Sequence, residues 1–154
     1  VEKLSKFAGH EGIAGGQFLD LNFEKRKIPK SRIIEMQIKK TGKLFSFCTM
    51  VPSIIKNKNT KIVNKFDKIG SDIGLLFQIK DDLIDYSGST KKVGKKTKKD
   101  LKKGKATLIS LLGYKNTIKY ASKLKLNIFK RLNKFGNETQ ELKRTINYIL
   151  ERNK

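Results

Sequence analysis

The sequence predicts an all-α protein. Only two prolines, Pro29 and Pro52, occur in 154 residues, and apolar residues recur every three or four positions over long stretches, which is the spacing of an amphipathic helix. A chain of this length can bury the core of one domain. Because no linker and no internal repeat interrupts the pattern, we expect residues 1–154 to form a single domain.

The first half of the chain is predicted to form two helices. One covers 3–21 and contains Gly15 and Gly16. Two glycines inside a helix cost about 1 kcal/mol each, so we expect them to allow another helix to pack closely. The second helix covers 31–50, and we expect it to end near Pro52, because proline lacks the N–H that continues a helix.

The second half is predicted to contain a long helix over 60–86 and a loop over 87–105. The helix carries apolar residues at helical spacing from Phe66 to Phe77, whereas the loop is rich in lysine and glycine and has no apolar periodicity. Further helices are expected over 106–112, over 116–134, and over a last segment that begins with Asn137 and Gln140 as a capping box.

Composition excludes several classes of site. Cys48 and His10 are the only residues of their types, so we expect no disulfide framework, no zinc site and no histidine-based catalysis. A reducing, cytoplasmic location fits. No run of about eighteen apolar residues occurs, so no membrane span is predicted, and no signal peptide is visible.

The net charge of +22 suggests a nucleic-acid partner or another anionic surface. The lysines, however, are spread over almost every segment, arginine is scarce, and aromatic residues are not interleaved with the basic ones. We therefore expect most lysines to solvate helix faces, and we expect no nucleic-acid partner. The alternative, a basic nucleic-acid binder, predicts DNA affinity that falls with salt.

Three aspartates, Asp81, Asp82 and Asp85, fall within five residues at the end of the predicted long helix. Helical spacing puts them on one patch with Gln78. Like charges repel there, and a helix that ends near Gly88 adds an unfavourable macrodipole, each at a cost of roughly 0.3–1 kcal/mol. Mg²⁺ would remove the repulsion and leave positions for a phosphate ligand. A solvated acidic helix end is the alternative.

Two basic segments could hold the phosphate. The lysine-rich stretch 91–105 bends at glycines and could close over a polyphosphate held by Mg²⁺; a solvated basic loop is the alternative. Lys40 and Thr41 place a cation beside a hydroxyl, followed by Gly42, which is unfavourable in a helix and so suggests close packing. Taken alone, this triplet also fits an ordinary surface segment.

Four motifs stand in order along the chain: Gly15-Gly16-Gln17 with Asp20, Lys40-Thr41-Gly42 with Leu44, Gly70 to Asp85 with Phe77-Gln78 before the aspartates, and Gly94-Lys95 with Asp100 and Gly104-Lys105-Ala106-Thr107. They resemble the GGQxxDL, KTGxL, GxxxGxxFQxxDDxxD and GKxxxxDxxxGKxT segments of the polyprenyl synthetase family. The resemblance is closest to the C-terminal half of bacterial short-chain trans-prenyl diphosphate synthases of the farnesyl type. The final segment, with Arg152, resembles the basic tail of that branch.

The resemblance implies an all-α bundle of the isoprenoid-synthase type, incomplete because only the C-terminal half is matched. It implies Mg²⁺ and the head-to-tail condensation of an allylic diphosphate with isopentenyl diphosphate to farnesyl or geranylgeranyl diphosphate. It also implies a homodimer. By the matched positions, the catalytic residues are Lys40, Thr41, Asp81 and Lys95. Lys40, Thr41, Gln78 and Lys95 would hold the allylic diphosphate. The metal site would consist of Asp81, Asp82 and Asp85, with Asp82 in support.

The chain also departs from the family pattern. The histidine that often precedes the KTG segment is absent from Glu35–Lys39. The first aspartate-rich motif and the basic residues for isopentenyl diphosphate have no match, and the chain begins with Val1, so we expect a fragment that is inactive alone. The alternative is a non-catalytic half-chain that binds a partner or forms part of a split synthase. A terpene cyclase is disfavoured, because its second motif is of the NSE/DTE type.

Overall fold

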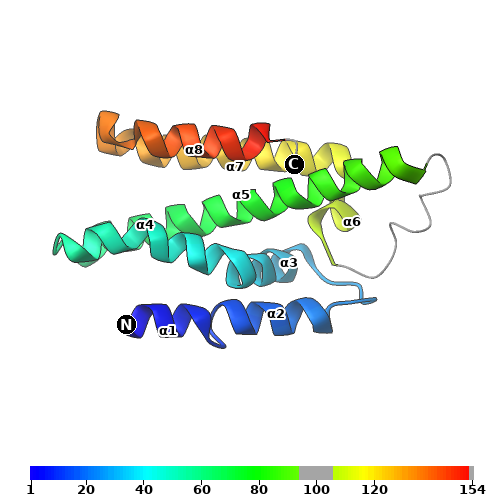
Figure 1. Ribbon diagram of the computed structural model, residues 1–154, viewed down its shortest axis with the longest axis horizontal. Helices are drawn as coiled ribbons and strands as arrows, with labels where there is room; N and C mark the ends of the chain where they lie inside the picture. The colour runs from blue at the N-terminus through cyan, green and yellow to red at the C-terminus, as the bar shows by residue number, and fades with distance from the viewer. Residues whose placement is uncertain (94–105, 153–154) are drawn as a thin grey trace.

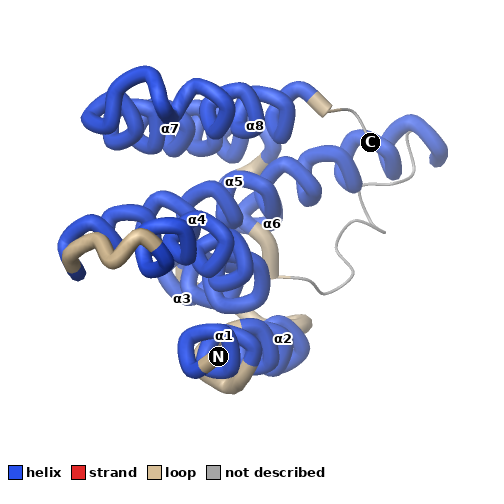
Figure 2. Tube along the Cα trace, turned by 60° about the vertical axis from the view of Figure 1, so that its left-hand side comes forward, coloured by secondary structure: helices blue, strands red, loops and turns tan. Residues whose placement is uncertain are grey.

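The protein is a helical bundle in the computed structural model, which describes the backbone of residues 1–93 and 106–152 and the side chains of 1–88 and 106–152. No strand occurs in these ranges, so the all-α prediction is confirmed. The helices lie in three layers, which the views in Figures 1 and 2 both show. The layers are α1 (Glu2–Ala8) with α2 (Ile13–Asn22); α3 (Lys30–Gln37), a π-helix (Ile38–Gly42), α4 (Lys43–Ile55) and α5 (Thr60–Val93); and α7 (Tyr114–Leu132) with α8 (Gln140–Glu151).

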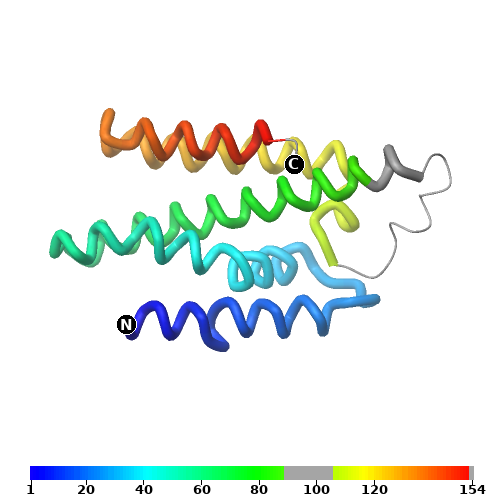
Figure 3. Tube along the Cα trace, viewed as in Figure 1, coloured from blue at the N-terminus to red at the C-terminus, as the bar shows by residue number. Residues whose placement is uncertain are grey.

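The central element is α5, which runs the length of the molecule and contacts α4 on one side and α7 and α8 on the other (Figure 3). The short helix α6 (Leu108–Leu112) packs beside it. Leu76 and Ile79 of α5 are fully buried, as are Ile128 of α7 and Ile146 of α8. Each such side chain contributes roughly 1.5–3 kcal/mol on burial, and together they hold α5 against the layer of α7 and α8.

Glycines bring the backbones of neighbouring helices together. A Cβ at Gly16 of α2 would lie 2.2 Å from the backbone nitrogen of Lys40, so the close packing predicted for this glycine is present. A Cβ at Gly70 of α5 would lie 2.1 Å from Thr49 Oγ1 and 2.6 Å from the Phe45 carbonyl oxygen of α4. The α4–α5 contact therefore has no room for a side chain at Gly70.

This contact gives a stability prediction. Gly70→Ala should lower the free energy of unfolding by about 1–3 kcal/mol, because the helices must separate to admit the methyl group. Gly88→Ala is the matched control on the same helix: nothing lies within 4 Å of its added Cβ, so the gain in helix propensity should stabilise the protein by about 0.5–1 kcal/mol. Urea denaturation of the full-length variants measures both changes. Equal effects at the two positions would show that α4 and α5 do not pack this closely.

The predicted helix boundaries need correction in the first half. The segment 3–21 is two helices, because the chain leaves the helical conformation at Gly9 (φ −76°, ψ −155°) and resumes it after Gly12. Pro52 does not end the second helix, since α4 continues to Ile55. The buried side chains of Met50 and Ser53 hold the chain on either side of the proline, and the Lys56 N–H donates to the Pro52 carbonyl at 3.0 Å to close the last turn.

The second half differs at two places. The helix predicted over 60–86 continues to Val93, so the aspartates do not lie in its last turn and the macrodipole argument does not apply to them. A single glycine, Gly88, costs only about 1 kcal/mol and does not stop a long helix. The predicted loop is therefore helical over 87–93, and 94–105 lie outside the described residues.

The predicted capping box at Asn137 is also wrong. Residues Asn133–Thr139 form a 3₁₀ segment with Gly136 at φ 71°, and α8 begins after Thr139 without a side-chain cap. The Thr139 hydroxyl instead donates back to the carbonyls of Leu132 and Gly136, at 3.3 and 3.0 Å. None of the described helices is both long and apolar enough to cross a membrane.

Candidate functional site

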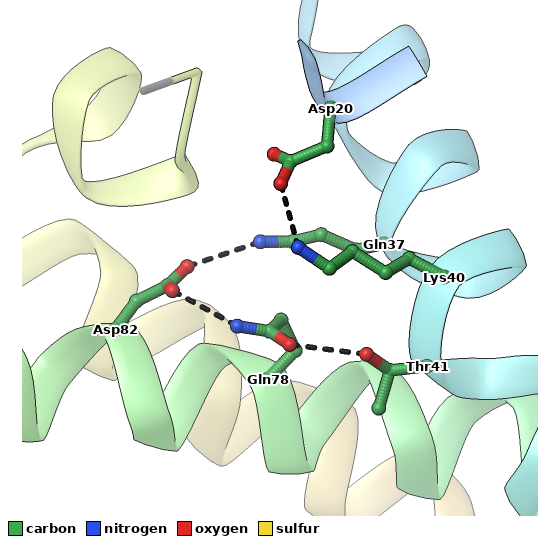
Figure 4. Close-up of polar contacts among 6 residues, drawn as sticks. All are labelled: Asp20, Gln37, Lys40, Thr41, Gln78 and Asp82. Carbon is green, nitrogen blue, oxygen red and sulfur yellow. Dashed lines mark hydrogen bonds and ion pairs between the residues drawn. The ribbon is translucent and has the colours of Figure 1, made fainter. Parts of the chain in front are cut away.

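The candidate site forms where the π-helix Ile38–Gly42 meets α5. A π-helix adds a residue to the turn and is frequent at functional sites. Gly42 at its end packs directly on α5, because a Cβ at Gly74 would lie 2.6 Å from the Gly42 Cα. This close approach places the side chain of Thr41 beside α5 and that of Lys40 towards α2 (Figure 4). The sequence predicted a continuous helix here and gave no sign of the wider turn.

A chain of three hydrogen bonds joins the π-helix, α5 and α3 (Figure 4). Thr41 Oγ1 donates to Gln78 Oε1 at 3.0 Å, and Gln78 Nε2 donates to Asp82 Oδ1 at 3.1 Å. Gln37 Nε2 donates to the other carboxylate oxygen, Asp82 Oδ2, at 3.0 Å. Three residues named from the sequence, Thr41, Gln78 and Asp82, are thus linked through Gln78, and Gln37 is a member of the chain that the motifs did not indicate.

Lys40 pairs with Asp20 of α2 (Figure 4). Its Nζ lies 2.6 Å from Asp20 Oδ2, and both side chains are partly buried. Asp20 belongs to a predicted motif, but the sequence assigned it no role. The pair holds the ammonium group beside the Thr41 turn and neutralises it there.

Asp81 pairs with Arg152, the residue that follows α8. The Arg152 guanidinium also lies 4.1 Å from the centroid of the Phe77 ring, a cation–π contact. The side chains of Arg152 and Asp81 are 18% and 36% exposed, so the pair is partly shielded from water. The sequence suggested only a basic tail at this end, with no partner for Arg152.

The three aspartates therefore have different surroundings. The pKa of Asp82 is raised to about 6, chiefly by burial and also by the charges of Asp85 and Asp81, while hydrogen bonds from Gln78 and Gln37 oppose the rise. Asp85 is exposed. Among the side chains that the structure describes, no three Asp, Glu, His or Cys residues are close enough to hold a metal ion, so the predicted patch does not form a complete metal site within this part of the chain.

The donors nevertheless fit Mg²⁺ as part of a site. Asp81 and Asp85 are one helical turn apart on α5, and Asp85 is open to solvent. Mg²⁺ in proteins is commonly held by one or two carboxylates, with substrate phosphates and waters in the remaining positions. Asp82, with both oxygens engaged by amide groups, is suited to support rather than ligation. Lys95 lies outside the described residues.

The pKa of Asp82 gives a pH prediction. Its value in the folded protein lies above the ordinary 3.8, so folding favours the protonated form. The stabilisation is present below about pH 4 and is lost as the pH rises through about 6. Between these limits, without divalent metal, the free energy of unfolding should fall by roughly 2–3 kcal/mol relative to Asp82→Asn. Urea denaturation of both proteins from pH 4 to 7 measures this difference, and parallel curves would contradict it.

Comparison with known proteins identifies the family. The sequence model described as polyprenyl synthetase matches residues 5–149. The chain belongs to the polyprenyl synthetase family. Within the family, it is 33% identical over 154 residues to the farnesyl diphosphate synthase of Micrococcus luteus, an alignment that covers 100% of this chain and 53% of that protein. The geranylgeranyl diphosphate synthase of Cyanophora paradoxa is 32% identical over 143 residues, 92% of this chain and 48% of that protein.

Solved structures of the family have the same all-α fold. The FPP/GFPP synthase of Zymomonas mobilis, solved in its apo form, superposes with a TM-score of 0.80 at 35% identity, over 96% of this chain and 49% of that one. The geranyltransferase of Helicobacter pylori, solved with magnesium and isoprenyl diphosphate, superposes with a TM-score of 0.75 at 25% identity, over 97% and 49%. The chain thus spans about half the length of the family members it matches.

Proposed function

We propose that this chain is the diphosphate- and metal-binding half of a prenyl diphosphate synthase. The complete enzyme would condense an allylic diphosphate with isopentenyl diphosphate, head to tail, to give farnesyl or geranylgeranyl diphosphate. The observation that carries this proposal is the direct contact of Thr41 with Gln78 and of Gln78 with Asp82, beside the Lys40–Asp20 pair. Family membership supports it, and does not favour a non-catalytic half-chain.

Each residue has a distinct role in this proposal. Asp81 and Asp85 would ligate Mg²⁺, with Asp82 in support. When bound, Mg²⁺ would neutralise charge on the leaving diphosphate as the carbon–oxygen bond breaks. Lys40, Thr41, Gln78 and Lys95 would hold the allylic diphosphate, the lysines as point charges and the others through hydrogen bonds. Loss of a proton after carbon–carbon bond formation completes the condensation, and the group that accepts it is not assigned to this chain.

The proposal extends to the complete protein. The first aspartate-rich motif and the isopentenyl diphosphate site would lie outside these 154 residues, and the chain alone would be inactive. A cytoplasmic homodimer is part of the same proposal. The direct test is product formation by the full-length protein from labelled isopentenyl diphosphate and dimethylallyl diphosphate with Mg²⁺. Absence of any prenyl product from folded full-length protein would refute it.

The lysine-rich segment gives a kinetic prediction. Lys95→Ala in the full-length protein should raise the KM for the allylic diphosphate by about tenfold, the effect of one lost charge-assisted hydrogen bond. Lys99→Ala is the matched control from the same segment and should leave that KM within about twofold, because Lys99 stands at a variable position of the matched motif. Steady-state kinetics at fixed ionic strength measures both. Equal effects would show that only bulk charge matters.

A further inference from the structure

Gln37 is a buried polar residue in an apolar setting. It is the last residue of α3 and is 2% exposed, next to Met36 at 3%. Burying an amide costs free energy unless its polar atoms find partners. Gln37 Nε2 donates to Asp82 Oδ2 at 3.0 Å, but its Oε1 is buried with no hydrogen-bond partner among the described residues. The Gln37 amide therefore donates to Asp82, while its own carbonyl oxygen has no hydrogen-bond partner among the described residues.

The carboxylate of Asp82 fixes the direction of the whole chain of hydrogen bonds. An ionised carboxylate only accepts hydrogen bonds, so both Gln37 and Gln78 must turn their NH₂ groups towards it. Gln78 Oε1 then faces Thr41, and the Thr41 hydroxyl donates to it. Turning either amide around would place a carbonyl oxygen against a carboxylate oxygen, which is repulsive. The orientation of Thr41 thus depends on Asp82.

Two hydrogen bonds tie the segment 37–41 to α5 at two points (Figure 4). Gln37 and Thr41 are four residues apart on one segment, and Gln78 and Asp82 are four residues apart on α5. Gln37 contacts Asp82, and Thr41 contacts Gln78. Because these two hydrogen bonds lie at opposite ends of the π-helix turn, they prevent the turn from rotating about α5. The turn also carries Lys40, so these two contacts set the placement of two of the proposed diphosphate ligands, Lys40 and Thr41.

We propose that Gln37 is a positioning residue for the diphosphate site: by donating to Asp82 it holds the side chains of Gln78 and Thr41 in place, so that Gln78 can donate its second N–H to the allylic diphosphate and Thr41 can donate its hydroxyl once that bond turns from Gln78. This inference rests on the proposed function. Gln37 acts through other residues, because at 2% exposure it cannot reach a ligand itself. If Gln37 served packing alone, an apolar side chain of the same size could replace it without loss of diphosphate binding. The experiment tests this substitution.

The test uses Gln37→Met in the full-length protein, which keeps the length and volume of the side chain but removes its donor. We expect the KM for the allylic diphosphate to rise about tenfold, with the KM for isopentenyl diphosphate within twofold of wild type. The Kd for inorganic diphosphate with Mg²⁺, measured by calorimetry, should rise in parallel. Thr117→Val is the control: Thr117 is fully buried in α7 and bonded to the Leu108 and Gly113 carbonyls, so its loss should lower stability without changing either KM.

A double-mutant cycle tests whether Gln37 acts on Thr41 through Asp82 and Gln78. If Gln37 acts through Thr41, then Gln37→Met combined with Thr41→Val should be little worse than Thr41→Val alone. Should Gln37→Met fail to fold, Gln37→Glu keeps the shape, replaces the donor with an acceptor, and should raise the same KM. Unchanged allylic KM and diphosphate Kd in a folded variant, or additive effects in the cycle, would overturn the inference. Failure of the wild-type protein to make any prenyl product would instead refute the proposed function.

Discussion

Asp81→Ala in the full-length protein is expected to lower kcat by about a hundredfold or more, because the proposed Mg²⁺, which would stabilise the leaving diphosphate, would lose one of its ligands. The helix should remain intact, since Asp81 is 36% exposed and packs nothing in the core. Stability should fall slightly rather than rise, because Arg152 loses its carboxylate partner. Steady-state kinetics and circular dichroism measure the two effects.

Arg152→Ala is the matched control for this prediction. It breaks the same ion pair and removes the contact with Phe77, but it leaves the carboxylate available to metal. The loss of kcat should be much smaller than for Asp81→Ala. Near-normal turnover of folded Asp81→Ala would remove Asp81 from the metal site. Equal losses in the two variants would show that the ion pair, and not metal ligation, is what the reaction needs.

The second large effect concerns the chain by itself: the isolated 154 residues should form no detectable prenyl product. The family resemblance places only one of two aspartate-rich motifs here, so one side of the proposed metal–diphosphate complex would have no ligands. Large apolar side chains also stand exposed on the described helices, among them Phe18 at 66% and Leu21 at 61% on α2. Exposed apolar patches of this kind promote association, so the isolated chain should self-associate or bind a fragment that supplies the other half of the proposed enzyme.

The assay is labelled isopentenyl diphosphate with dimethylallyl diphosphate and Mg²⁺, carried out with and without a fragment that supplies the first aspartate-rich motif. Activity restored only by that fragment is the expected result, and size-exclusion chromatography should show the two pieces eluting together. Robust product from the mass-verified chain alone would contradict the prediction and would require a different active-site arrangement.

Sequence periodicity predicted the helices that carry the site, but not the contacts between them. The apolar spacing around Ile69, Ile73 and Leu76 located α5 because these side chains fill the core on a single helix. The motifs named Thr41, Gln78 and Asp82 together. The partners Gln37 and Arg152 were not predicted, because they reach α5 from 45 and 71 residues away, and no local pattern encodes such a distance.

The remaining differences between the predicted and the observed structure depend on how the helices pack, which the local sequence does not determine. A π-helix at Ile38–Gly42 and a normal helix give the same apolar spacing over five residues, and the contact of Gly42 with Gly74 accompanies the wider turn. Pro52 and Gly88 were both predicted to end a helix. Packing of the residues beside Pro52 lets α4 continue, and the small free-energy cost of one glycine lets α5 continue past Gly88. The three aspartates read as one patch, although partners on α3 and beyond α8 draw Asp82 and Asp81 apart.

The tight glycine contact between α4 and α5 has a consequence for how mutations would sort in a genetic screen. Because α5 is unbroken from Gly70 past Asp81, a shift at the glycine is carried along about 16 Å of helix to the carboxylates. Substitutions at Gly70 or Gly74 should therefore be recovered among inactive clones together with those at the aspartates, although neither glycine has a side chain that could bind substrate. Compensating changes would be sought in α4, at Thr49 for Gly70 and at Phe45 for Gly74, where a smaller side chain removes the side-chain part of the clash.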